Sequence, residues 1–339
     1  MTSDSRRLVL ASRPSGMVDD SVVRTDTVAV AEPGPGEAVV RVRYLSIDPT
    51  IRTWMDDAPG YLPPIEIDAV IRSGGIGEVV ASNSDRYAVG DTVFGMLGWQ
   101  DHAVIGSDDA RAQVVPEGID ATAALSVFGT TGMTAYFGLL DIGRPREGDT
   151  VVVSGAAGAT GSVVGQIAKL KGAGRVVGIA GSDEKGAWLT DELGFDGAVN
   201  YKTEDVRAKL RELCPDGIDV YFDNVGGEIL DICLSQLAMN ARVVCCGAIS
   251  AYNDDRAAAY GLTNYFTLIT KRARMEGFLI LDYLDRFGDA QAEMGGWVLE
   301  GKVKHAVHVV DGLENAPDAL NLLFTGGNIG KVIVAVDGD

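Results

Sequence analysis

Apolar residues change their spacing near residue 120, and this change divides the chain into two kinds of structure. Before it, short β-branched segments such as 39–44 are separated by turns rich in Pro and Gly, which is typical of a barrel or sandwich-like β domain. After it, apolar strands such as 151–153 alternate with amphipathic helices such as 162–171. Strands without a polar face favour a parallel sheet that helices cover on both sides.

The alternation continues through most of the second half. Helices are expected within 121–140, around a turn at 129–132. Further strands are expected at 175–179, 198–200, 218–223 and 242–246, and further helices at 183–193, 204–213 and 228–237. This order predicts an α/β fold with a doubly wound, Rossmann-type parallel sheet. The last apolar segment, 331–336, is expected to be one more strand that could rejoin the N-terminal β domain.

Charge and hydropathy exclude several classes of partner. The 339 residues include 48 acidic and 29 basic ones, which gives a formal net charge of −19. So acidic a chain is a poor binder of nucleic acid or of an anionic membrane surface, because both need a surplus of Lys and Arg. There is no apolar run of about eighteen residues and no N-terminal signal core, so we expect a cytoplasmic protein without a membrane span.

The cysteines and histidines do not form a metal-binding pattern. No two cysteines have the CxxC spacing, and all of them follow residue 213; they are Cys214, Cys233, Cys245 and Cys246. The three histidines are His102, His305 and His308. We therefore predict reduced, mostly packed thiols and no metal site.

A glycine-rich turn is the first candidate binding site. Residues 155–161 read GAAGATG, and they stand between an apolar strand and an amphipathic helix. Such a turn lets the backbone approach a pyrophosphate at a helix N-terminus. The spacing is GxxGxxG rather than GxGxxG, so the motif is weak alone, but its placement predicts dinucleotide binding. The alternative is a merely tight connection between strand and helix.

The end of the next strand indicates which dinucleotide. An NAD-preferring fold usually carries an acid there for the ribose hydroxyls, whereas this chain has Ala180 and Gly181. Ser182 suits a helix N-cap, and Lys185 opposes the helix dipole unless an anion lies nearby. We interpret Ser182 and Lys185 as a 2′-phosphate site and hence predict NADPH. The alternatives are a solvated Lys185, or Asp183 as the ribose ligand of an NAD enzyme.

Several motifs in one order resemble the zinc-independent branch of the medium-chain dehydrogenase/reductase superfamily, namely the prostaglandin reductase, alkenal/one oxidoreductase and curcumin reductase-like enzymes. The motifs are 155–161 with 163–172, 181–185, 200–203, 221–227, 246–253 and 327–331, with 45–49 and Arg52 in the first half. The resemblance implies a GroES-like substrate domain made of 1–126 and 303–339. It also implies a Rossmann domain of 127–302, NADPH as cofactor and a homodimer.

The resemblance also assigns residues to the cofactor. Ala157, Gly158, Ala159, Thr160 and Gly161 would bind it at the glycine turn, with 157–160 at the pyrophosphate. Lys185 and Tyr201 would lie at the 2′-phosphate, and Asn224 at a ribose. Cys246, Gly247, Ala248, Ile249, Ser250 and Tyr252 would line the path from adenine to nicotinamide. Phe278, Leu279 and Ile280 would border the nicotinamide, and Asn328 would reach it from the C-terminal segment.

Each of the single-residue assignments has a plainer alternative. Tyr201 could be a surface residue at a strand end, and Asn224 and Asn328 could be turn residues. Residues 278–280 could form a core strand. Arg52 could anchor a substrate carboxylate, but an ion pair with an acid is the stronger reading.

Two departures from the superfamily pattern limit what the resemblance implies. Where zinc-dependent members have a Cys and a His, this chain has 48–50 (Asp-Pro-Thr) and 74–78 (GGIGE). In addition, Thr50 stands where mammalian-type members often have an aromatic residue, so a prostaglandin or leukotriene substrate is not supported.

The expected chemistry follows from these residues. With no metal and no Ser/His/Asp set, NADPH would transfer a hydride to the β-carbon of an α,β-unsaturated ketone or aldehyde. Tyr252 is the candidate donor to the carbonyl oxygen, where negative charge develops; alternatively it only packs or lines the cofactor. The chain is thus predicted to be an enone or enal reductase acting on a small electrophile. A quinone reductase and a non-catalytic NADPH-binding sensor are the alternatives.

Overall fold

The computed structural model describes residues 4–109, 112–254 and 260–337. The chain forms two compact units. One consists of Met1–Leu125 with Val307–Asp339, and the other of Ser126–Ala306. Both ends of the chain therefore belong to the same unit, and the intervening segment folds as the other.

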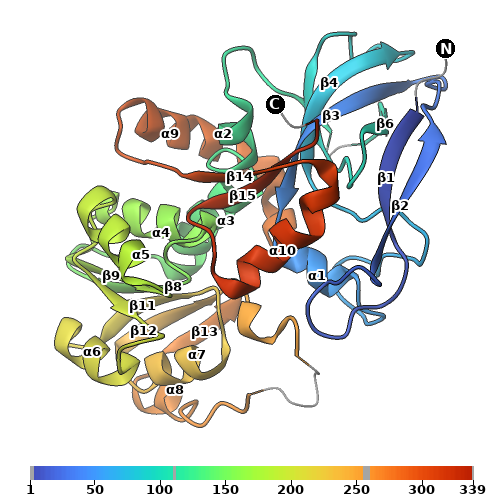
Figure 1. Cartoon of the computed structure of the whole chain (residues 1–339). Coiled ribbons are helices and arrows are strands. Elements are labelled where there is room, and N and C mark those ends of the chain that lie inside the picture. The colour runs from blue at the N-terminus through green and yellow to red at the C-terminus, as the bar shows by residue number, and fades with distance from the viewer. Residues whose placement is uncertain (1–3, 110–111, 255–259, 338–339) are drawn as a thin grey trace. The chain divides into compact units, whose positions relative to one another are not determined.

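The second unit is built on a six-stranded parallel sheet (Figure 1). Its strands are β8 (Thr150–Ser154), β9 (Arg175–Ala180), β10 (Gly197–Asn200), β11 (Ile218–Asp223), β12 (Leu237–Cys245) and β13 (Arg274–Gly277), in the spatial order β10-β9-β8-β11-β12-β13. The chain moves outward from β8 to β10 and then returns to continue from β11 to β13. The strand order thus reverses between β8 and β11, and in open α/β sheets ligands bind at this switch point.

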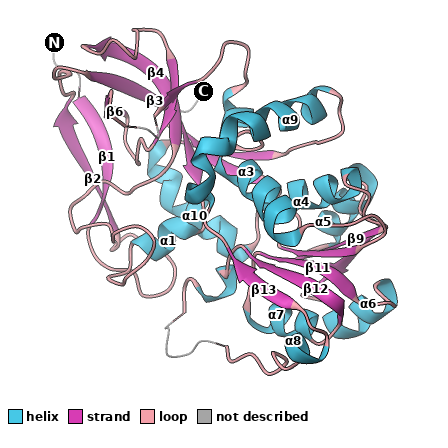
Figure 2. Cartoon of the chain, turned by 180° about the vertical axis from the view of Figure 1, so that it is seen from behind, coloured by secondary structure: helices cyan, strands magenta, loops and turns pink. Residues whose placement is uncertain are grey.

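Helices cover both faces of this sheet (Figure 2). On one face lie α4 (Ala159–Leu170) and α5 (Asp183–Ala187), and on the other α6 (Val206–Leu213), α7 (Gly227–Leu234) and α8 (Thr267–Thr270). The strands are buried on both sides; Val151, Val152 and Val153 have no exposed surface. This arrangement is the predicted doubly wound fold, and the prediction of the fold class is confirmed.

Three element predictions need correction. The helix expected at 183–193 divides into α5 and a π-helical turn, Trp188–Glu192. The helix expected at 228–237 ends at Leu234, and β12 begins at Leu237, because Leu237 pairs with Ile218 of β11 and is buried beside it. Residues 130–132, expected in a turn, begin helix α3 (Thr130–Phe137), so only Gly129 remains outside it as the N-cap.

The first unit is rich in β structure. Strands β1 (Asp4–Leu10) and β2 (Val23–Ala29) form an antiparallel pair. A second sheet has the order β14 (Val307–Asp311), β15 (Lys331–Ala335), β3 (Glu37–Ile47), β4 (Gly75–Ser82), β5 (Thr92–Gly95) and β7 (Gln113–Val114), with β6 (His102–Gly106) paired to β3. The expected C-terminal strand is β15, and it lies antiparallel to β3. Helix α10 (Ala316–Thr325) connects β14 to β15.

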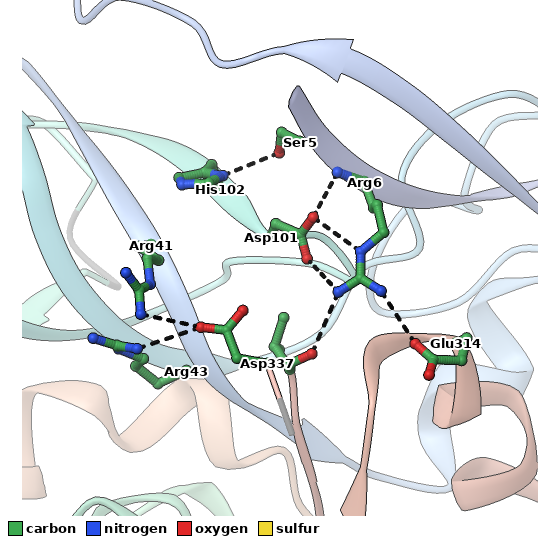
Figure 3. Close-up of polar contacts among 9 residues, drawn as sticks. Ser5, Arg6, Arg41, Arg43, Asp101, His102, Glu314 and Asp337 are labelled. Atoms are coloured by element: carbon green, nitrogen blue, oxygen red, sulfur yellow. Dashed lines mark hydrogen bonds and ion pairs between the residues drawn. The ribbon is translucent and has the colours of Figure 1, made fainter. Parts of the chain in front are cut away.

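Ion pairs connect the two ends of the chain within this unit (Figure 3). The guanidinium of Arg6 donates to both carboxylate oxygens of Asp101, at 3.1 and 3.2 Å, and to Glu314 at 3.2 Å. Arg43 pairs with Asp337 at 3.3 Å. Such partly exposed pairs add little stability singly, but the network fixes where the C-terminal tail lies.

A buried ion pair fixes β15 more firmly. The Lys331 side chain is 1% exposed, and its Nζ donates to the carbonyl oxygen of Ile47 at 2.6 Å and to Asp48 at 2.8 Å. Ser46 donates to the other oxygen of Asp48 at 2.6 Å. Burial lowers the pKa of Lys331, while the Asp48 carboxylate opposes that shift. The pair therefore compensates a charge that would otherwise be costly inside the unit.

Removing one partner of this pair should destabilise the protein strongly. We expect Asp48→Asn to lower the free energy of unfolding by about 3 kcal/mol, because it leaves Lys331 buried without its counter-charge. The double variant Asp48→Asn/Lys331→Met should recover much of that loss, since it removes both charges. Urea unfolding of the wild type, Asp48→Asn, Lys331→Met and the double variant measures these free energies. Equal losses of unfolding free energy in Asp48→Asn and in the double variant would contradict the prediction.

Candidate functional site

The glycine turn lies at the carboxyl end of β8 and opens α4. Gly155 has a φ of +58°, which favours glycine. A Cβ on Gly161 would stand 2.5 Å from the carbonyl oxygen of Gly155, so a side chain has no room there. The N-cap of α4, Gly158, provides no side-chain cap. The first N–H groups of α4, at Ala159, Thr160 and Gly161, therefore have no intrahelical acceptor and suit an anion.

A buried carboxylate organises the neighbouring turn. Asp223 ends β11 and is 2% exposed. Its Oδ1 accepts from the hydroxyls of Ser154 (3.0 Å) and Tyr221 (2.8 Å), and from the N–H groups of Val225 (3.1 Å) and Gly226 (3.0 Å). Burial raises the pKa of Asp223, and these hydrogen bonds oppose the shift. The carboxylate thereby joins the end of β8 to the turn that follows β11.

Asn224 is held in the same turn. Its Nδ2 donates to the carbonyl oxygen of Ser154 at 2.7 Å, and its backbone N–H donates to the Ser154 hydroxyl at 2.9 Å. The Cβ that Gly155 lacks would lie 3.4 Å from the Asn224 side chain. The turn-forming role considered for Asn224 is therefore present, with its amide nitrogen engaged within the protein. Contact with a cofactor ribose stays a prediction.

The loop after β12 packs against this turn. The N–H groups of Cys246 and Gly247 both donate to the carbonyl oxygen of Asp223, at 2.9 and 3.0 Å. The N–H of Ala248 donates to the hydroxyl of Tyr252 at 3.2 Å. This bond ties the Tyr252 hydroxyl to the backbone at the start of the loop. Burial raises the pKa of the Cys246 thiol to about 12, so this thiol is protonated near neutral pH.

The next residues of this loop contact the Asn224 turn. The N–H of Ile249 donates to the carbonyl oxygen of Asn224 at 3.3 Å, and the Ser250 hydroxyl donates to that of Val225 at 2.6 Å. The structure thus brings the glycine turn, the turn after β11 and the loop 246–252 together at one edge of the sheet.

The predicted 2′-phosphate residues lie together after β9 and β10. The Ser182 hydroxyl accepts from the N–H of Lys185 at 3.2 Å, so Ser182 is the N-cap of α5, as expected. Tyr201 is 43% exposed, and its ring lies against Gly181. Burial is the main cause that lowers the pKa of Lys185. The carboxylate of Asp183, the alternative ribose ligand, accepts from Asn200 at 2.8 Å.

The remaining predicted cofactor residues are placed differently. Phe278 and Leu279 follow the end of β13, and a 3-10 helix begins at Ile280, so these three residues are not the core strand considered as an alternative. The ring of Phe278 packs against Gly138. Asn328 belongs to the other unit, where it is buried and donates to the carbonyl oxygen of Gly330 at 2.9 Å. A role of these residues at the nicotinamide stays a prediction.

In the first unit, Arg52 and Thr50 are both engaged in contacts within the protein. Arg52 is buried, and it pairs with Asp56 at 2.6 Å and donates to the Gly16 carbonyl at 2.8 Å, which is the structural ion pair we favoured. Thr50 shares a hydrogen bond of 2.5 Å with the hydroxyl of Tyr61.

Among the residues that the structure describes, no three His, Cys, Asp or Glu side chains are grouped so as to hold a metal ion. Within the same residues, no helix is long and apolar enough to cross a membrane.

Sequence reasoning missed two residues of this region. Asp223 received no role, although an acid that ends a buried strand beside the switch point is a recognisable signal. Lys202 also received none, and no spacing in the sequence places its charge beside Lys185; only the neighbouring strand ends do so.

The arrangement can bind a nucleotide along the carboxyl edge of the sheet. The first N–H groups of α4 are uncapped and could bind an anion, and cationic side chains lie after β9 and β10. A tyrosine hydroxyl stands in the loop after β12. Fold and site together are those of a Rossmann-type dinucleotide-binding protein.

Comparisons with known proteins agree with this class. Residues 6–114 match a family described as the N-terminal domain of oxidoreductase, and residues 159–294 one described as zinc-binding dehydrogenase. The NADPH-dependent curcumin reductase of Escherichia coli (strain K12) is 43% identical over 99% of this chain and 98% of its own. The NADP(+)-dependent 2-alkenal reductase of Nicotiana tabacum is 40% identical over 94% and 92%.

A solved structure is also similar over the whole chain. The crystal structure of CurA in complex with NADPH from Vibrio vulnificus has a TM-score of 0.92 and 42% identity, and it covers 98% of this chain and 100% of that one. The chain belongs to the medium-chain dehydrogenase/reductase family of NADP-dependent oxidoreductases, in its zinc-independent reductase branch. The resemblance seen in the sequence is thereby confirmed.

The close packing of the glycine turn can be tested by one methyl group. Gly161→Ala should lower the free energy of unfolding by about 2 kcal/mol and should weaken nucleotide binding, because the added Cβ displaces the Gly155 carbonyl. Gly296→Ala is a matched control, since a Cβ there meets nothing within 4 Å and α9 (Phe287–Leu299) is helical. Thermal unfolding and NADPH fluorescence titration measure both; a Gly161→Ala protein that behaves like the control contradicts the argument.

Proposed function

We propose that this protein is an NADPH-dependent reductase of the carbon–carbon double bond of α,β-unsaturated ketones and aldehydes, acting without a metal. The observation that carries the proposal is the grouping of Ser182, Lys185 and Tyr201 at one end of the sheet edge, with Tyr252 further along it. The curcumin and 2-alkenal reductases named above support the substrate class. The GroES-like substrate domain, the homodimer and the cytoplasmic location remain predictions.

The protein's residues fit NADPH at three places. The N–H groups of 159–161 would hold the pyrophosphate, because Gly158 leaves them uncapped. Lys185 and Tyr201 would hold the 2′-phosphate. The loop 246–250 would line the path toward the nicotinamide, and Asn224, residues 278–280 and Asn328 would contribute as the resemblance implies. When bound, NADPH supplies the hydride that reduces the substrate's β-carbon.

Tyr252 would act on the substrate's carbonyl oxygen. As the β-carbon gains hydride, negative charge moves to that oxygen and an enolate forms. A tyrosine hydroxyl is a hydrogen-bond donor, so Tyr252 can donate to this oxygen. The hydroxyl of Tyr252 accepts from the Ala248 N–H, and this bond holds the phenol within the loop that follows β12. The proton for the α-carbon comes from Tyr252 or from water.

A cofactor-consumption assay tests the reaction class. We expect purified protein to oxidise NADPH with a medium-chain enal and with an aryl enone, and to release the saturated aldehyde or ketone. A preference for NADPH over NADH is expected as well. Turnover confined to a simple quinone would replace the proposal by a quinone reductase. Tight NADPH binding with no turnover across the panel would instead favour a sensor.

The role of Tyr252 predicts a particular kinetic pattern. Tyr252→Phe should lower kcat by about 100-fold, as expected for loss of one donor to a developing oxyanion, with a much smaller change in NADPH affinity. Tyr265→Phe is the control, because Tyr265 is exposed and lies in the same segment between β12 and β13. If NADPH affinity and kcat fell together in Tyr252→Phe, Tyr252 would be a cofactor-lining residue rather than a donor.

A further inference from the structure

Lys202 lies near Lys185 although the two residues follow different strands. Lys185 is in α5, after β9, and Lys202 follows β10. These strands are parallel neighbours, with Asn200 opposite Ala180, so the segments that follow them leave the same edge of the sheet. The positive charge of Lys202 is the second cause, after burial, that lowers the pKa of Lys185, and Glu184 opposes the shift. Two like charges are thus held close to each other.

Tyr201 defines the space between these strand ends. Its N–H donates to the carbonyl oxygen of Ala180 at 3.1 Å, and a Cβ on Gly181 would lie 3.1 Å from its ring. The Nζ of Lys202 is 6.0 Å from the centre of the same ring. The partly exposed ring therefore has Gly181 at one side and a cationic side chain close by.

A buried amide fixes the backbone of both segments. Asn200 is 8% exposed. Its Nδ2 donates to Asp183, in the first turn of α5, at 2.8 Å, and its Oδ1 accepts from the N–H of Lys202 at 3.1 Å. The Glu204 carboxylate accepts from the N–H of Asn200 at 2.8 Å. Hydrogen bonds through Asn200 thus connect the backbone segments that carry the two lysines.

We propose that Lys202 is a second cation of the adenosine 2′-phosphate subsite, and that with Lys185 it sets the preference for NADPH over NADH. This inference rests on the proposed function, and it adds a residue that neither the motifs nor the family resemblance assigned. The two ammonium groups of Lys185 and Lys202 repel each other. A phosphate dianion bound between them would offset this repulsion. The 2′-hydroxyl of NADH carries no charge and cannot do so, so the pair discriminates between the cofactors.

Binding of nucleotide fragments tests the role of Lys202 without any turnover. Isothermal titration calorimetry with 2′,5′-ADP and with 5′-ADP compares ligands that differ in the 2′-phosphate. Lys202→Ala should weaken 2′,5′-ADP binding by about tenfold, as for loss of one charge-assisted contact, and should affect 5′-ADP much less. Lys202→Arg should retain most of the affinity, and Lys202→Glu should lose more than Lys202→Ala. Higher salt should reduce the wild-type preference for 2′,5′-ADP.

Lys209→Ala is the matched control, because Lys209 is a lysine of α6 that pairs with Glu212 at 3.1 Å. If Lys202→Ala bound 2′,5′-ADP as tightly as Lys209→Ala does, the inference would be overturned. An equal loss for 2′,5′-ADP and 5′-ADP would also overturn it, because that pattern means a distorted loop. Failure of the proposed reaction looks different: the fragments would bind in the expected order, while no enal or enone consumed NADPH.

Discussion

The carboxyl edge of the parallel sheet depends on the buried carboxylate of Asp223. One carboxylate oxygen accepts hydrogen bonds from two hydroxyls and two backbone N–H groups. The backbone carbonyl oxygen of Asp223 accepts from the N–H groups of Cys246 and Gly247. Buried polar groups are costly when unpaired, so these turns and their carboxylate stabilise one another. The ends of β8, β11 and β12 are thereby held in one arrangement, and the candidate site is built on these ends.

The same burial determines the chemical character of the site. Burial, with a contribution from the Asp223 charge, raises the pKa of Cys245 to about 11 and that of Cys246 to about 12. Protonated thiols are poor nucleophiles, so these two cysteines are expected to be unreactive near neutral pH. Lys185 and Lys202 lie at the other end of the edge, after β9 and β10. Although the chain is strongly acidic, two cationic side chains thus lie near each other at this end of the edge.

The first unit uses its charges differently. Lys331 and Asp48 form an internal pair at the point where the C-terminal strand joins the N-terminal sheet. Residues 48–50 stand near the place where zinc-dependent members of the superfamily are expected to have a cysteine, and here the oxygens of Asp48 accept from Lys331 and Ser46. In this chain Asp48 therefore contributes to the packing of the first unit. Beside it, Thr50 engages Tyr61 in a hydrogen bond.

The sequence by itself determined the strand and helix order, the glycine turn and the N-cap at Ser182, because hydrophobic periodicity, tight turns and caps are local properties. It did not determine the start of β12, which depends on the pairing of Leu237 with Ile218 across the sheet. Only the tertiary structure decided that Lys202 lies near Lys185. The same holds for the hydrogen bonds by which Asp223 connects the end of β8, the turn after β11 and the loop after β12. Such contacts join residues from separate strand ends, and their distances are set by sheet register rather than by spacing along the chain.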